Sequence, residues 1–262
     1  MSKKIVAIGG GHNGRIREDG TKAPYETGPM DLEIIRLTEK QNPNFLFLGH
    51  AGLEYEDSYF ETMVRIYKDM YSCECKMLKA IDLTNTEKVN ELISWADIIY
   101  EGGGNTKTMI ELWVKTGFDK ILKQAYEDGK VMCGVSAGAN CWFKACSSDA
   151  LQIETGDPNA PLIKVECLGL INAFVTPHCD ENGRFIATRD LLKDENIVAI
   201  LLSNCAAIEI VDDKYKIILS ELVEDPEFLP YVQRAFWTSS NSYNWKNIKV
   251  TEEFKKLSEI LL

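Results

Sequence analysis

One serine lies between two glycines at the end of an apolar run and could act as a nucleophile. The run is Lys130-Val-Met-Cys-Gly-Val-Ser-Ala-Gly-Ala-Asn140, which places Ser136 between Gly134 and Gly138. This G-x-S-x-G pattern is typical of a nucleophile elbow, where a sharp strand-to-helix turn holds the serine in a strained conformation and exposes its hydroxyl. A side chain at either glycine would collide with the neighbouring backbone. Strand–helix junctions of other α/β proteins are also rich in Gly, Ser and Ala, so Ser136 is a candidate nucleophile on this pattern alone.

A serine nucleophile needs a base, and the chain offers only three histidines. His178 follows the strand-like Val175-Thr176-Pro177 and precedes a polar loop, which places its imidazole at the rim of a sheet. We predict that His178 is the base. His50 is the alternative, whereas His12 lies in a glycine-rich loop where close packing explains it.

The acid that would orient the base is open on the sequence. Asp149 falls between Ser136 and His178 in the chain, within a polar loop that could reach the imidazole. The alternatives are Asp180, Glu181 and Glu209. Each of these four is also typical of a solvated loop acid or a helix cap.

Backbone N–H groups for an oxyanion hole are expected in two places. Gly102-Gly103-Gly104 precedes a helix, and three glycines in a row indicate that a group approaches the backbone closely. The N–H of Ala137, together with that of Gly103 or Gly104, would stabilise a tetrahedral oxyanion. A tight β-to-α turn alone would explain one or two of these glycines.

Composition excludes several classes of protein. Of the 262 residues 45% are hydrophobic and 26% charged, as in ordinary globular proteins, and the net charge of −11 argues against binding nucleic acid or anionic membranes. The first residues lack the apolar region of a signal peptide and no apolar run reaches membrane-spanning length, so we expect neither a signal peptide nor a membrane span. Its eight cysteines lack metal-type spacing, so we expect reduced thiols, a cytoplasmic location and no metal. Gly9-Gly-Gly11-His-Asn-Gly14 matches G-x-G-x-x-G, but the polar residues that follow do not open a helix, so no nucleotide cofactor is expected.

Short Val- and Ile-rich runs alternate with amphipathic segments, which predicts an α/β fold with a parallel sheet covered by helices on both faces. The expected strands are Lys4–Ile8, Phe45–Leu48, Glu74–Ala80, Ile98–Tyr100, Val131–Val135, Ala173–Thr176, Ala206–Val211 and Tyr215–Leu219. The expected helices are Asp31–Lys40, Ser58–Met70, Thr86–Trp95, Thr106–Lys115, Phe118–Asp128 and Arg184–Leu192. Because ligands bind beyond the carboxyl ends of parallel strands, the loops that carry the candidate residues should converge at one edge.

Three motifs together resemble the peptidase E family, the S51 serine peptidases that include aspartyl dipeptidases and cyanophycinases. They are Glu101-Gly-Gly-Gly-Asn-Thr106, Gly134-Val-Ser-Ala-Gly-Ala-Asn140 and Thr176-Pro-His178, and the resemblance covers about residues 1–220. It implies a flavodoxin-like three-layer sandwich with a mostly parallel sheet, related to class I glutamine amidotransferases with Ser in place of Cys. It also implies neither a metal nor an organic cofactor.

The resemblance assigns roles to residues of this chain. Ser136 matches the nucleophile, His178 the base, and the Gly-Gly-Gly-Asn105 run the oxyanion loop, with Asn105 facing substrate. Asp149 lies near the place of the triad acid, although the local spacing differs. Arg184 and Arg189 follow the base and would bind a substrate carboxylate; alternatively they form a charged helix face with Asp190 and Asp194.

The implied activity is hydrolysis of small peptides, with preference for an N-terminal aspartate. An amidase or esterase on the same scaffold, or a non-catalytic binding module, are the alternatives. We expect one domain over residues 1–262, with an extension at 221–262 that holds a loop, Glu221–Pro230, and a terminal helix, Thr251–Leu262. The extension and the polar stretch Gly11–Pro29 have no counterpart in a minimal version of the fold. Either of these two segments would cover the site or form a homodimer contact.

Overall fold

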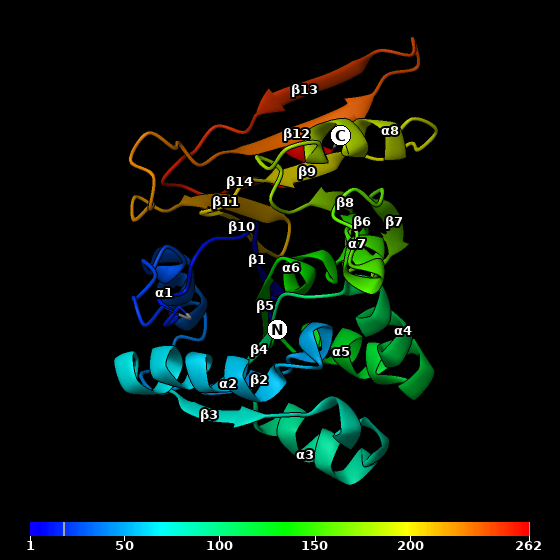
Figure 1. Cartoon of the computed structure of the whole chain (residues 1–262). Helices are drawn as coiled ribbons and strands as arrows, with labels where there is room; N and C mark the ends of the chain where they lie inside the picture. The colour runs from blue at the N-terminus through cyan, green and yellow to red at the C-terminus, as the bar shows by residue number, and fades with distance from the viewer. Residues whose placement is uncertain (18, 262) are drawn as a thin grey trace.

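The structure is a computed structural model that describes residues 1–17 and 19–261. Within these residues two mixed sheets carry the fold (Figure 1). In spatial order the first sheet contains β14 (Lys255–Lys256), β11 (Lys214–Leu219), β10 (Ala206–Val211), β1 (Lys4–Ile8), β5 (Val131–Val135), β4 (Ile98–Glu101), β2 (Asn44–Phe47) and β3 (Glu74–Met77). The second contains β13 (Tyr243–Asn247), β12 (Val232–Trp237), β9 (Ala199–Leu202), β8 (Ile171–Thr176), β6 (Phe143–Ser148) and β7 (Ile163–Glu166).

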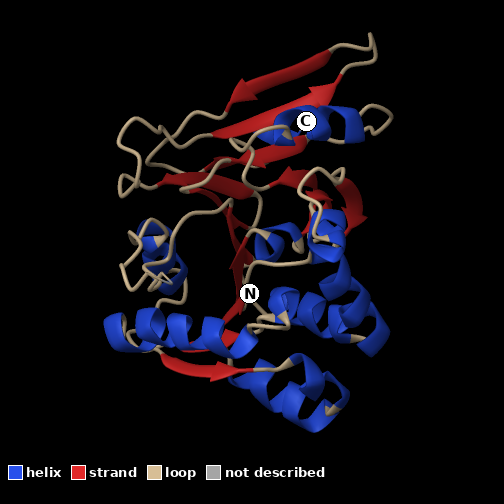
Figure 2. Ribbon diagram, in the orientation of Figure 1, coloured by secondary structure: helices blue, strands red, loops and turns tan. Residues whose placement is uncertain are grey.

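Helices gather mainly around the first sheet, whereas β12 and β13 form a strand-rich end of the molecule (Figure 2). The α-helices are α1 (Gly28–Arg36), α2 (Glu56–Val64), α3 (Thr86–Trp95), α4 (Thr106–Thr116), α5 (Phe118–Glu127), α6 (Ala137–Asn140), α7 (Ala150–Thr155), α8 (Arg184–Leu191) and α9 (Ser258–Leu261). Two 3₁₀ turns, η1 (His50–Gly52) and η3 (Ala80–Thr84), and a π-helical segment, η2 (Arg65–Met70), complete the helical elements.

Strand β1 shows why the first sheet needs a helical layer on each face. Alternate side chains of a strand point to opposite faces. Ile5 and Ala7 pack in the core with residues of α3, α4 and α5, whereas Val6 and Ile8 pack with residues of α1, α2 and η2. All four side chains are fully buried, so β1 is a central strand of the molecule.

The expected α/β class is confirmed, but the expected mostly parallel sandwich is not. Strands β1, β5, β4, β2 and β3 are parallel, and β10, β11 and β14 add antiparallel pairs to the same sheet. In the second sheet β6, β8 and β9 are parallel, whereas β7, β12 and β13 are antiparallel. Apolar runs indicate that a strand exists, but they do not fix its direction or its sheet.

The C-terminal segment extends both sheets. Strands β12 and β13 pair next to β9, and β14 pairs with β11. The expected terminal helix is confirmed only for Ser258–Leu261, and residue 262 lies outside the described residues. In the part of the chain that the structure describes, every helix is too short or too polar to cross a bilayer.

The two sheets meet where their strands end. The loop after β1 and the loop after β8 are joined by a hydrogen bond from His178 N–H to the Gly9 carbonyl, 3.1 Å. The turn after β9 joins the same loop, because Cys205 N–H donates to the Gly10 carbonyl at 3.0 Å. Strand ends from both sheets therefore frame one common region.

Candidate active site

Ser136 occupies the single residue between β5 and α6. Its backbone lies in the left-handed region, with φ 57° and ψ −113°, and its N–H donates to the Ile8 carbonyl. A β-carbon on Gly134 or Gly138 would lie 2.3 or 2.0 Å from the Glu101 carbonyl oxygen, so glycine is required at both positions. Strain of this kind costs about 1–3 kcal/mol and persists where the surrounding structure imposes it.

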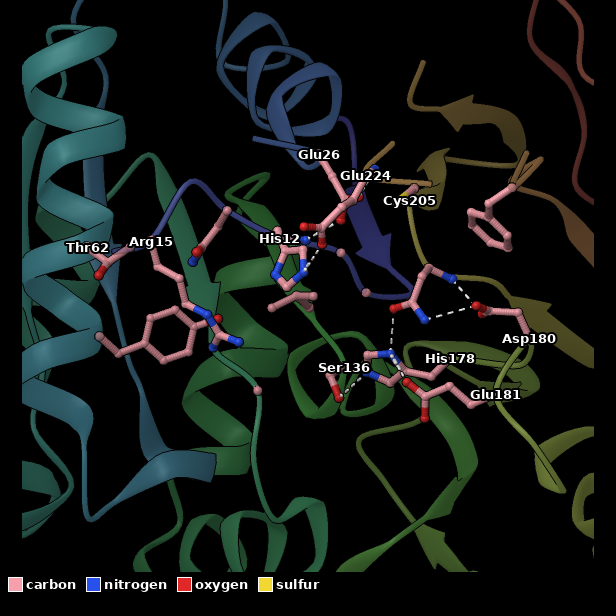
Figure 3. Close-up of a pocket in the computed structure, with 18 of the residues that line it drawn as sticks. His12, Arg15, Glu26, Thr62, Ser136, His178, Asp180, Glu181, Cys205 and Glu224 are labelled. Carbon is pink, nitrogen blue, oxygen red and sulfur yellow. Dashed lines mark hydrogen bonds and ion pairs between the residues drawn. The ribbon is translucent and has the colours of Figure 1, made fainter. Parts of the chain in front are cut away.

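His178 faces Ser136 across the junction of the two sheets. Its Nε2 lies 3.0 Å from Ser136 Oγ, and its Nδ1 lies 2.8 Å from Asn204 Oδ1 (Figure 3). An amide oxygen can only accept, so Nδ1 must carry the proton of the neutral imidazole. The lone pair of Nε2 is then free to accept the hydroxyl proton of Ser136. This is the tautomer that a general base requires.

The orientation of the Asn204 amide is fixed by Asp180. Asn204 Nδ2 donates to Asp180 Oδ2 at 3.0 Å, and the Asn204 backbone N–H donates to Asp180 Oδ1 at 2.7 Å. Because a carboxylate accepts hydrogen bonds, it selects the nitrogen side of the amide and turns the oxygen toward His178. Asp180, Asn204, His178 and Ser136 thus form one continuous hydrogen-bonded chain.

The structure gives the other candidate acids different surroundings. Glu181 Oε1 lies 3.4 Å from His178 Nδ1, while Glu181 Oε2 accepts from Arg184. Asp149 was expected to orient the base, but it pairs with Arg184 at 2.8 Å and has no hydrogen bond to His178. This corrects the expectation, and the reason is that α8 carries Arg184 to the Asp149 loop. Glu209 lies on β10 beside Glu33 and Arg36, and burial raises its pKa to about 8.

His50, the alternative base, has no ring nitrogen to spare. Its Nε2 lies 2.8 Å from the Leu78 carbonyl, and its Nδ1 accepts from Trp113 Nε1–H at 2.9 Å. The ring is fully buried, and this burial lowers the pKa of His50 to about 4. His50 is therefore a neutral core residue.

The candidate oxyanion groups separate into two kinds. Gly103 lies beside the serine, because a β-carbon placed on it would be 3.5 Å from Ser136 Cβ. Ala137 is the first residue of α6, where backbone N–H groups have no acceptor within the helix. Gly104 instead packs against the Ala51 carbonyl, and Asn105 caps α4 by accepting from Thr108 N–H.

A cavity of about 860 Å³ opens above Ser136 and His178. Figure 3 shows Ser136 and His178 at its base, Asp180 and Glu181 on one side, and Arg15 with Thr62 on the other. Its lining comes from the loop after β1, from α2, from the strand ends of both sheets and from residues 224–228. The arrangement presents a hydroxyl, a base and backbone N–H groups to one open cavity.

Comparison of the sequence with known protein families agrees with a hydrolytic site of this geometry. The family model described as Peptidase family S51 matches residues 21–218. The chain belongs to peptidase family S51. This S51 peptidase is a hydrolase of peptide bonds.

Relatives of the S51 peptidase carry peptidase names. It is 27% identical over 214 residues to the uncharacterized peptidase YgaJ of Bacillus subtilis, covering 81% of this chain and 85% of that one. It is 24% identical to Peptidase E of Shewanella denitrificans, over 42% of this chain and 44% of that one.

Solved structures share the fold. The crystal structure of a peptidase from an acI-B1 Actinobacterium matches with a TM-score of 0.66 at 18% identity, over 98% of this chain and 97% of that one. A candidate peptidase E protein from Listeria monocytogenes matches with a TM-score of 0.61 at 19% identity, over 84% of this chain and 100% of that one.

Two loops of the S51 peptidase border the cavity: the β1–α1 loop, described at residues 9–17 and 19–27, and the β11–β12 loop, residues 220–231. Glu26 is buried between them and accepts from His12 N–H and from Glu224 N–H, each at 2.7 Å. Glu224 also pairs with Arg17 at 2.6 Å and lies 3.1 Å from His12 Nε2. The β1–α1 loop and the β11–β12 loop are thus joined by hydrogen bonds and ion pairs, and together they form one wall of the cavity.

A buried carboxyl supports the oxyanion loop from behind. Glu101 is fully buried, and its Oε1 accepts from the N–H groups of Ala51 and Gly102, each at 3.1 Å. Burial raises the pKa of Glu101 to about 8. Across residues 1–17 and 19–261, no group of three or more His, Cys, Asp or Glu side chains is arranged to hold a metal ion.

Asn204 is the main site residue that sequence reasoning missed. It follows β9, whose sequence Ala-Ile-Leu-Leu is a short apolar run at 199–202. The polar Ser203-Asn204 pair directly after this run has the same signature as the loops that carry Ser136 and His178. Recognition of β9 as a strand would have identified it.

Proposed function

We propose that this S51 peptidase is a serine dipeptidase that prefers an aspartate at the N-terminus of its substrate. Ser136 is the nucleophile, His178 the general base and then the general acid, and Asn204, held by Asp180, orients the imidazole. The observation that carries the proposal is the 3.0 Å contact of His178 Nε2 with Ser136 Oγ in the base-competent tautomer.

The geometry supports the following sequence of steps. His178 Nε2 takes the proton of Ser136 Oγ while Oγ attacks the carbonyl carbon of the substrate. The N–H groups of Gly103 and Ala137 stabilise the oxyanion, and removal of one such donor costs about 10²–10³ in kcat. His178 then gives its proton to the leaving amine, and water, deprotonated by His178, hydrolyses the acyl-enzyme.

A small substrate is supported by the shape of the site. A cavity of about 860 Å³ lies within the range that encloses small ligands. The β1–α1 and β11–β12 loops limit the access of a folded protein to Ser136. Preference for aspartate follows from the resemblance to aspartyl dipeptidases, and one relative carries the name Peptidase E.

The test is hydrolysis of matched dipeptides, Asp-X and Asn-X with the same X, by wild-type and Ser136→Ala protein. Selective release of X from Asp-X that is lost in the variant supports both the activity and the nucleophile. If a fluorophosphonate labels Ser136 but the protein hydrolyses no dipeptide, the protein catalyses another acyl transfer, as an amidase or esterase does. If the protein is neither labelled nor active on dipeptides, it is a binding module without catalytic activity.

A further inference from the structure

The two arginines that the sequence suggested for substrate binding are engaged elsewhere. Arg184 is largely buried and binds Asp149 and Glu181. Arg189 binds Asp190, and its backbone carbonyl accepts from Trp237 Nε1–H. Neither arginine belongs to the residues that line the cavity.

Arg15 of the β1–α1 loop does line the cavity. Figure 3 shows its guanidinium reaching into the open space from the side of Thr62, across from His178 and Asp180. Within the described residues, no carboxylate pairs with this guanidinium, whereas Arg17, two residues along the loop, pairs with Glu224.

The backbone of Arg15 is held in place by neighbouring residues of its loop. Its carbonyl accepts from Ala23 N–H at 2.9 Å, and flanking antiparallel bridges join Asn13 to Tyr25 and Ile16 to Lys22. These backbone contacts hold the exposed Arg15 side chain at the wall of the cavity. A guanidinium presented on a fixed backbone needs little reorganisation to bind a ligand.

The charge of the surrounding wall makes Arg15 distinctive. The cavity lining includes five carboxylate side chains: Glu26, Asp180, Glu181, Glu224 and Asp225. Apart from His12 and His178, Arg15 is the basic side chain among the described lining residues. A free carboxylate on a substrate is therefore attracted at Arg15, while a free ammonium is attracted to the acidic side of the wall.

We propose that Arg15 binds a carboxylate of the peptide substrate and thereby sets the preference for acidic or zwitterionic dipeptides. The planar fork of a guanidinium matches a carboxylate in two parallel hydrogen bonds. The inference rests on the proposed function for its substrate class. The carboxylate belongs either to an acidic side chain at the N-terminal residue or to the C-terminus of the dipeptide.

The experiment compares four substrates, Asp-Leu, Asn-Leu and the leucinamide form of each, with wild-type and Arg15→Gln protein. Loss of a charge-assisted hydrogen-bonded pair lowers kcat/KM by about 10- to 100-fold. If Arg15 binds the aspartate side chain, the loss falls on both Asp substrates; if it binds the C-terminus, the loss falls on both free acids. Arg17→Gln removes the same charge from the same loop and should leave the ratios between substrates unchanged. Equal losses for all four substrates, or no loss, would overturn the proposal.

A binding measurement separates this inference from the proposed activity. Calorimetric titration of Asp-Leu into Ser136→Ala protein, with and without Arg15→Gln, needs no turnover. If the double variant binds Asp-Leu about 10- to 100-fold more weakly than Ser136→Ala protein, the role of Arg15 stands, even where the wild type hydrolyses no dipeptide. If the wild type hydrolyses dipeptides and Arg15→Gln leaves the ratios of kcat/KM between substrates unchanged, the dipeptidase stands and the role of Arg15 is overturned. Absence of binding to Ser136→Ala protein, with no hydrolysis by the wild type, overturns both.

Discussion

The side-chain oxygen of Asn204 lies 2.8 Å from Nδ1 of His178. The group in the orienting position is thus a neutral amide, and the carboxylate of Asp180 acts on the imidazole through that amide. When His178 takes the proton of Ser136, the positive charge is stabilised by a fixed dipole backed by an acid. Cys-His-Asn enzymes use the same kind of partner.

We expect Asn204→Ala to lower kcat by about 10- to 100-fold, since a hydrogen bond to a charged group contributes roughly 1.5–3 kcal/mol. Asn204→Asp places a carboxylate directly against Nδ1 but also removes the N–H that Asp180 accepts and sets two carboxylates side by side, so it should retain more activity than the alanine variant and less than wild type. Steady-state kinetics on one dipeptide measures both. Equal kcat for wild type and Asn204→Ala would remove Asn204 from the mechanism.

Asp149→Asn tests the acid that the sequence favoured. Because Asp149 binds Arg184 rather than His178, we expect a modest drop in Tm and a kcat within about threefold of wild type, as for substitutions outside the reacting groups. Thermal unfolding and kinetics on the same preparation separate the two effects. A folded variant that lost turnover would restore Asp149 as the triad acid.

Gly10→Ala should disable the site more than it destabilises the protein. A β-carbon there would lie 2.4 Å from His178 Nδ1 and 2.1 Å from Asn204 Oδ1, so the pair must separate. The control is Gly20→Ala in the same loop, where the backbone is left-handed but, among the described residues other than its two chain neighbours, no atom lies within 4 Å of the new carbon. We expect Gly10→Ala to lower kcat strongly when it is measured below the Tm of the variant, and Gly20→Ala to leave kcat close to that of the wild type. Thermal unfolding and steady-state kinetics measure the two quantities.

Glu101 makes stability depend on pH in a defined direction. Its pKa is raised from 4.5 to about 8 in the folded state, so the folded protein holds more protons than the unfolded chain between these values. The free energy of unfolding therefore falls as pH rises through this window, by up to about 1.4 kcal/mol per pH unit. Glu101→Gln removes this slope. Urea unfolding at pH 5 and pH 8 measures this: the free energy of unfolding of the variant, relative to that of the wild type, should be higher at pH 8 than at pH 5.

Glu209 titrates in the same window and contributes to the slope of both proteins. The difference between wild type and Glu101→Gln isolates Glu101. Parallel slopes for the two proteins would mean that Glu101 is ionised in the fold at neutral pH.

Local patterns predicted the local parts of this structure. The bounds of β1, β5, β10 and α3 agree with the sequence expectation, because each is a short run whose periodicity and caps are written in consecutive residues. The turn at Ser136 likewise depends on neighbours within two positions.

Pairings between distant segments could not be read in this way. Asp149 satisfied the expected chain order of a triad, but α8 places Arg184 against it. Asn204 was missed because β9 was not recognised, and its role depends on the docking of two loops 26 residues apart in the chain. The position of the Arg15 guanidinium, which pairs with no carboxylate of the residues that the structure describes, likewise depends on a loop fold that the sequence shows only as polar.

Ser136 follows a strand of one sheet, and His178 follows a strand of the other. Any partly folded chain in which the two sheets have not docked holds the nucleophile and the base apart. Peptide hydrolysis therefore begins only when the two sheets dock, and a chain still being synthesised has no active site that could cleave neighbouring proteins. In refolding experiments the return of activity would report the time of sheet docking, whereas circular dichroism would report the earlier return of helices and strands.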